Sequence, residues 1–138
     1  MAKRLFDAVN QDQVRLASSA LIEAEVCCNG LSRKNSARVH ELLRGWFTAP
    51  ATVWTDADRY LARAAVIIMN DHRDKGLKAT KMSSADAVHL AAAIRLEADY
   101  FMSYDNGFPH GHTVEGVRVQ HPNVVWQETL FQSGDESA

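Results

Sequence analysis

The sequence predicts an α/β domain with a short, mostly parallel sheet flanked by helices. Short apolar runs alternate with segments of helical periodicity along most of the chain, as in strand–helix–strand units. The 138 residues are enough for one domain with its own core. We therefore expect a single domain over residues 1–132 and a polar, frayed tail over residues 133–138.

The composition excludes several classes of protein. The net charge of −2 gives no strong overall attraction to nucleic acid. No apolar run approaches the roughly 20 residues needed to span a membrane, and no charged-then-apolar leader begins the chain. Cys27 and Cys28 are adjacent and fit neither a metal site nor a disulfide framework. We expect both cysteines to be reduced and the protein to be cytoplasmic.

The first half of the chain predicts short elements separated by clear breaks. Gly30 is a plausible C-terminal stop for a helix, and Ala49-Pro50 interrupts helical spacing. The expected elements, in order, are a helix over residues 1–10, a strand over 14–18, helices over 19–29 and 34–46, and a short strand at 53–54.

Two capping boxes mark the helices of the second half. Thr55 and Asp58 have the spacing of a capping box for a long helix that runs to about residue 73. Ser83 and Asp86 have the same spacing before an alanine-rich helix, which places Asp86 in a first turn where the helix dipole favours an anion. The remaining expected elements are a strand at residues 100–103, a turn at 105–107, and one or two more short strands at 117–119 and 124–126.

Asp86 and Asp105 are the first candidates for a functional site. Asp86 opens a helix, and Asp105 follows the strand at residues 100–103. Ligands of α/β folds bind where strands end and helices begin, so these two carboxylates can meet there. Each also has a purely structural explanation, since Asp86 matches the helix dipole and Asp105 is a turn residue beside Asn106 and Gly107.

Three segments together resemble the PIN domain, the fold of many metal-dependent ribonucleases and of VapC-type toxins. SSALIEAEV at residues 18–26 resembles a strand-to-helix segment of the family, whose acidic residue falls on Glu25. DAVHLAAA at residues 86–93 resembles the helix that opens with the family's second acid, here Asp86. ADYFMSYDNGF at residues 98–108 resembles the strand that ends in Thr/Ser-x-Asp, here Ser103 and Asp105. The resemblance spans about residues 5–119 and implies a three-layer PIN-like fold.

The chain departs from the family at its N-terminus. The family begins with a buried strand that carries an Asp, followed by Thr or Ser and then Asn or Ser. Asp7 lies in a helical context instead, so the chain resembles a PIN domain that begins after its first strand. In the family that strand lies mid-sheet, between the strands that match residues 14–18 and 100–103. Either the strand is encoded upstream of this sequence, or the remaining sheet closes up without it. We favour the first explanation.

The resemblance implies an endoribonuclease that hydrolyses RNA phosphodiester bonds by in-line attack of metal-activated water. Clustered carboxylates repel one another and need a cation, and hard oxygen ligands favour Mg²⁺ or Mn²⁺. Without the family's first Asp, metal affinity should be lower. The implied roles are metal binding and catalysis for Glu25, Asp86 and Asp105, a supporting hydrogen bond from Ser103, and RNA binding by Lys78 and Lys81.

The same resemblance implies partners as well as RNA. A toxin of this family is neutralised by a small antitoxin protein and forms a homodimer. Two other readings stay open: a catalytically impaired PIN-like module that only binds a protein, and a fragment that does not fold alone. Glu25 also has a structural explanation, as a solvated helix residue.

Overall fold

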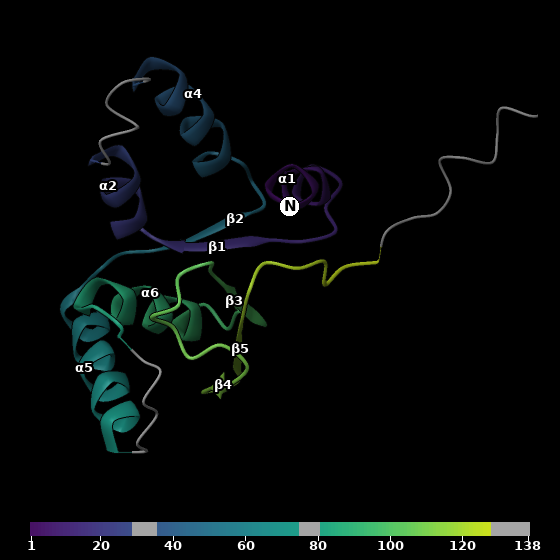
Figure 1. The fold of residues 1–138 in the computed structure, drawn as a ribbon. Helices are drawn as coiled ribbons and strands as arrows, with labels where there is room; N and C mark the ends of the chain where they lie inside the picture. The colour runs from purple at the N-terminus through teal and green to yellow at the C-terminus, as the bar shows by residue number, and fades with distance from the viewer. Residues whose placement is uncertain (29–35, 75–80, 128–138) are drawn as a thin grey trace, which may run out of the picture.

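The computed structural model describes residues 1–28, 36–74 and 81–127 of the chain, which alternates helices and strands (Figure 1). This alternation confirms the α/β class. The expected tail at residues 133–138 lies outside the described residues, as does Lys78. The elements, in order, are α1 (Ala2–Asn10), β1 (Leu16–Ser19), α2 (Leu21–Cys28), α4 (Ser36–Phe47), β2 (Thr52–Thr55), α5 (Arg59–Asp74), α6 (Ser84–Arg95), β3 (Tyr100–Met102), β4 (Thr113–Val114) and β5 (Val117–Gln120).

The described strands form two small sheets. β1 pairs in parallel with β2, with Ser19 opposite Thr55. β3 pairs in parallel with β5, and β4 is antiparallel to β5. The parallel pairing that the sequence predicts is confirmed, but β1 and β3 belong to different sheets. The resemblance expects a strand between the two that match β1 and β3, and the described residues provide none there.

Helix α6 connects the two halves of the molecule. It packs against α5, α2, β1 and β3, so it contacts strands of both sheets (Figure 1). Its alanines explain this position, because small side chains allow a helix to approach several neighbours closely. Leu90 of α6 is fully buried in the main apolar cluster, together with Leu61 of α5 and Val119 of β5.

The capping box at the start of α6 is confirmed, whereas the one expected at Thr55 is wrong. Ser83 Oγ accepts from the backbone N–H of Asp86 at 3.1 Å, and Asp86 Oδ2 accepts from the N–H of Ser83 at 2.9 Å. Thr55 instead ends β2, and α5 begins at Arg59. Asp58 caps α5, since its Oδ1 accepts from the N–H of Leu61 at 2.9 Å.

Of the two candidate strands at residues 117–119 and 124–126, only the first forms, as β5, and residues 124–126 adopt no strand conformation. Asn123 Oδ1 accepts the backbone N–H of Val124 at 2.8 Å, and such local side-chain hydrogen bonds compete with sheet ladders. Near this segment, the side chain of Gln13 donates to the backbone carbonyl of Gln127 at 3.1 Å, which ties the residues after β5 to those after α1. Among the helices that the structure describes, none combines the length and apolar character needed to cross a bilayer.

Candidate functional site

The first two turns of α6 carry two candidate side chains, Asp86 and His89. They are three residues apart, so they lie on the same face of the helix. The capping box holds one oxygen of Asp86 against the backbone of Ser83 and thereby fixes the position of the carboxylate. Both side chains are partly buried. The start of α6 therefore presents a carboxylate and an imidazole side by side.

His89 links three elements through its two ring nitrogens. Its Nε2 lies 2.6 Å from Glu25 Oε2, on α2, and its Nδ1 lies 3.3 Å from Ser19 Oγ, at the end of β1. A carboxylate only accepts hydrogen bonds, so Nε2 carries a proton and donates to Glu25. The Ser19 hydroxyl donates to Nδ1 where that nitrogen carries no proton, and accepts from it where it does. This geometry fixes the orientation of the Glu25 side chain.

Ser19, His89 and Glu25 have the order of a nucleophilic triad, but their burial does not suit that chemistry. Ser19 is only 1% exposed, so its hydroxyl cannot reach a substrate. A nucleophile must contact the group that it attacks. Glu25, by contrast, is the accessible member, with 41% of its side chain exposed. The array therefore positions Glu25 and does not activate Ser19.

Asp105 lies in a tight turn directly after β3. Its Oδ1 accepts the backbone N–H of Gly107 at 2.8 Å, and its own N–H donates to Ser103 Oγ at 3.0 Å. Ser103 is also held through its carbonyl, which accepts from His110 Nε2 at 2.8 Å. The Ser103 hydroxyl thus holds the backbone of the turn, while its own O–H proton is available to a further acceptor.

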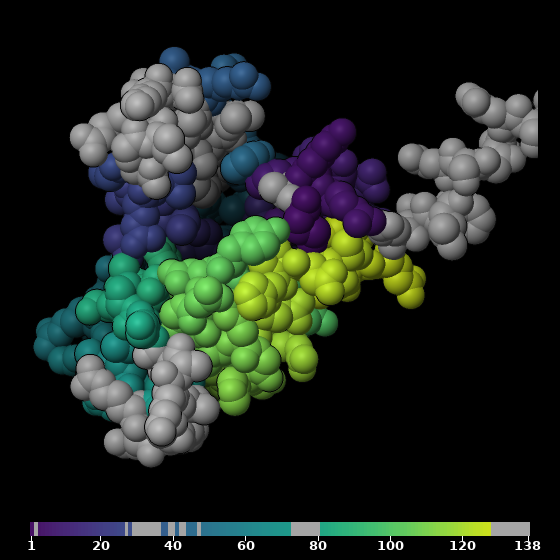
Figure 2. Space-filling model, viewed as in Figure 1, coloured from purple at the N-terminus to yellow at the C-terminus, as the bar shows by residue number. Residues whose placement is uncertain are grey.

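The turn at Asp105 packs against the segment that leads into α6. A Cβ added to Gly107 would lie 3.1 Å from the carbonyl oxygen of Lys81, two residues before the Ser83 cap. Glu25 approaches α6 from another side, through His89. Figure 2 shows the surface of α2, in blue-violet, resting on the teal and green surface of the α6 region. The three predicted acids therefore all lie around the first half of α6, and Lys81 is exposed beside them.

The described carboxylates do not converge on one point. Within residues 1–28, 36–74 and 81–127, no three His, Cys, Asp or Glu side chains are grouped to hold a metal ion. Carboxylate oxygens are nevertheless the donors that Mg²⁺ prefers, and Mg²⁺ commonly binds only one or two carboxylates and keeps several waters. The donor chemistry of Glu25, Asp86 and Asp105 therefore fits a hydrated divalent cation.

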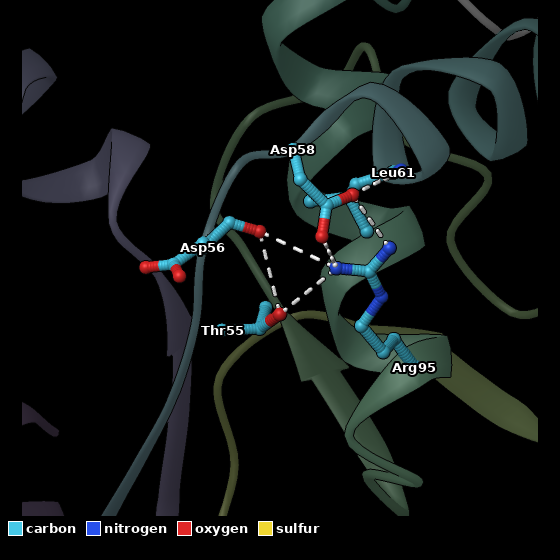
Figure 3. Close-up of polar contacts among 5 residues, drawn as sticks. All are labelled: Thr55, Asp56, Asp58, Leu61 and Arg95. Atoms are coloured by element: carbon cyan, nitrogen blue, oxygen red, sulfur yellow. Dashed lines mark hydrogen bonds and ion pairs between the residues drawn. The ribbon is translucent and has the colours of Figure 1, made fainter.

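Arg95 stabilises the other end of α6. Its guanidinium forms two hydrogen bonds with the Asp58 carboxylate, at 2.8 and 2.9 Å, and a third with Thr55 Oγ1 at 3.1 Å (Figure 3). The hydrogen bonds from Arg95, and then the one from the N–H of Leu61, lower the pKa of Asp58 from 3.8 to about 2. Through this contact, the last turn of α6 is joined to the end of β2 and the start of α5.

Sequence reasoning missed the roles of His89 and Arg95. The sequence shows that His89 shares a helix stripe with Asp86 and that Arg95 interrupts an apolar face. The partners of both residues lie far along the chain: Glu25 is 64 residues from His89, and Asp58 is 37 from Arg95. No local spacing reveals such pairs. The resemblance at Glu25 and Asp86 was the one signal that could have drawn attention to His89.

Comparisons with known proteins do not assign the chain to a family. No protein-family model matches the sequence, and neither the curated proteins nor the solved structures contain a match to it. The fold and the contacts around α6 are therefore the basis for a functional proposal, together with the resemblance of the three segments.

Proposed function

We propose that this chain is a PIN-type, divalent-metal-dependent endoribonuclease that acts on single-stranded RNA. The observation that carries the proposal is the position of Glu25, Asp86 and Asp105. These acids come from three distant segments and lie around the first half of the same helix. The segments that contain them are also the ones that resemble the family. On the same resemblance, we propose a small antitoxin protein as a partner, a homodimeric state and a cytoplasmic location.

Each residue of the site would have its own role in metal binding or catalysis. Asp86 and Asp105 would hold Mg²⁺ or Mn²⁺, directly or through water. Each would use the carboxylate oxygen that accepts no backbone hydrogen bond. Such an ion lowers the pKa of a bound water and polarises a phosphate oxygen. Glu25, held by His89, would orient the attacking water or complete the metal site. The Ser103 hydroxyl would donate to a carboxylate or to the RNA phosphate.

The substitution Asp86→Asn tests this proposal. The amide keeps an oxygen that can accept the N–H of Ser83, so the capping box can survive while the negative charge is lost. We expect RNA cleavage in Mg²⁺ to fall by at least about 100-fold, because stabilising charge in a metal-assisted transition state is worth several kcal/mol. The measurement is the cleavage rate of a labelled single-stranded RNA.

Asp99→Asn is the matched control, since Asp99 is an exposed acid at the opposite end of β3. It should cleave as fast as the parent chain. Equal cleavage by the Asp86→Asn variant and the parent chain, at equal folded fractions, would refute the nuclease proposal.

A catalytically impaired, protein-binding module is the second candidate. The separation of β1 and β3 into two sheets favours it, because in the family the strand between them carries a metal-binding Asp. Saturable binding of Mn²⁺ separates the two candidates. If Mn²⁺ binds and Asp105→Asn removes the binding, the impaired module is the wrong reading. If no binding occurs at millimolar Mn²⁺, the nuclease proposal is wrong.

A further inference from the structure

We propose that a cavity between α5, α6 and β4 is a binding site for an organic ammonium ion with an apolar body. The cavity has a volume of about 440 Å³ and lies on the α5 side of α6, away from the acids around the first turns of that helix. Pockets of roughly 300–1,000 Å³ hold small organic molecules in proteins. The proposal is independent of the nuclease function.

The floor of the cavity is apolar and rigid. Ile68 of α5 and Ala91 of α6 line it and are 7% and 2% exposed, and both belong to the main buried cluster. Ile67, which is 61% exposed, extends this apolar surface to the entrance. Covering such a surface with an apolar group is favourable, because it removes apolar area from water. The ligand should therefore present an aromatic or aliphatic body to the floor.

The polar part of the wall includes two acidic side chains. Asp71 of α5 and Glu115, directly after β4, line the cavity from two different elements, and the lining residues that the structure describes include no lysine or arginine. The ion pairs described for Glu25 and Asp58 involve neither of the two cavity carboxylates. Two carboxylates beside an apolar floor favour a cation with an apolar body, and low salt strengthens that attraction.

The arrangement suits an organic cation better than a metal ion. His72 and His112 also line the cavity, so two imidazoles and two carboxylates surround it. These four side chains form no metal-binding group among the described residues. A ligand must instead extend from the apolar floor to the acidic wall. A primary amine on a phenyl or alkyl body does so, whether it is a free molecule or the side chain of a lysine in a peptide.

The test compares 2-phenylethylamine with 2-phenylethanol, which has a similar shape but no charge. Binding to the full chain is followed by NMR, through the methyl groups of Ile67 and Ile68 and the imidazole of His112. We expect saturable shifts with the amine, at least tenfold tighter binding than the alcohol at low salt, and loss of this preference in the Asp71→Asn/Glu115→Gln variant.

The matched control is Glu97→Gln/Asp99→Asn, which removes the same charge from two exposed acids outside the cavity. It should keep the preference for the amine. The proposal is overturned if the amine gives no saturable shifts, if the alcohol binds as tightly, or if the control variant loses the preference equally.

A third ligand, an acetylated phenylalanyl-lysine amide, distinguishes the two sources of the ammonium group. Binding tighter than that of 2-phenylethylamine identifies a protein lysine as the occupant that the site favours. Weaker or equal binding of the peptide identifies a free amine. Either result supports the site, because the charged group and the apolar body are common to both.

Discussion

The candidate site depends on one histidine that contacts residues from two distant segments. His89 holds Glu25 with one ring nitrogen and Ser19 with the other, and only 11% of its side chain is exposed. A partly buried imidazole with both nitrogens engaged has little freedom to rotate. The position of the Glu25 carboxylate is therefore set by the packing of α6 against β1 and not by α2 alone.

Removing the imidazole should destabilise the fold through Ser19. In the His89→Phe variant, the buried Ser19 hydroxyl loses its partner, which costs about 1–3 kcal/mol. In a Ser19→Ala background, the same substitution should cost about 1 kcal/mol less, because no hydroxyl is left without a partner. Urea unfolding of the parent, both single variants and the double variant measures this difference. Effects that add to within about 0.3 kcal/mol would show that the two side chains are not coupled.

The Asp58 carboxylate should make stability depend on pH in the acid range. Its pKa in the folded chain is lowered to about 2, so its contribution is fully present above about pH 4 and is lost as the pH falls through 2. Asp58→Asn keeps an acceptor for the N–H of Leu61 and removes the charge that Arg95 binds. The variant should be less stable than the parent at pH 6, and the difference should shrink between pH 4 and pH 2. Urea midpoints across this range give the measurement.

Asp56→Asn is the control, because Arg95 contacts the backbone carbonyl of Asp56 while its carboxylate points away (Figure 3). Its difference from the parent should change less with pH. A constant difference for Asp58→Asn over the whole range would contradict the assignment.

At the scale of elements, local signals located the described helices and four of the five described strands, but not β4 and not every boundary. The start of α6 was predictable because Ser83 and Asp86 satisfy each other's backbone within one turn. Thr55 shows the same spacing with Asp58, yet it pairs with Ser19 in the β1–β2 sheet, and its hydroxyl accepts from Arg95. Tertiary contacts therefore overrode an equally good local pattern. The sequence identified Glu25, Asp86 and Asp105 as candidate residues, but it gave no indication of which residues Glu25 contacts.

The capping box gives a direct test at the start of α6. Ser83→Ala removes the acceptor for the N–H of Asp86 and should cost about 1 kcal/mol of stability. Ser84→Ala is a matched control, since Ser84 is exposed and is the first residue of the helix itself. Its effect should stay within about 0.5 kcal/mol. Equal losses in urea unfolding of the two variants would show that the box contributes nothing specific.

At the scale of the whole molecule, the main apolar cluster is confined to one part of the chain. All of its buried members lie between Leu61 and Val119, on α5, on α6 and the residues just before it, and on the segments around β3 and β5. The elements before α5 join this part through α6, by packing of β1 and α2 and by the polar contacts of His89 and Arg95. The sequence predicted β1, β2, β3 and β5, but it predicted neither β4 nor this division, because strand pairing depends on contacts between distant residues.

This division predicts two levels of stability. The β1–β2 sheet buries little apolar surface of its own, with Ala17 and Val53 exposed, so it should open at a lower free energy than α6. Native-state hydrogen exchange should therefore give smaller opening free energies, and smaller urea slopes, for the amides of β1 than for the amides of α6 near Leu90. Ser19→Ala should lower the values in β1 further and leave those in α6 less affected, because the lost hydroxyl anchors β1 to His89. If the amides of both elements exchange only by one common opening, with the same free energy and slope, the molecule unfolds as a single unit and α6 binds the two sheets far more tightly than its contacts indicate.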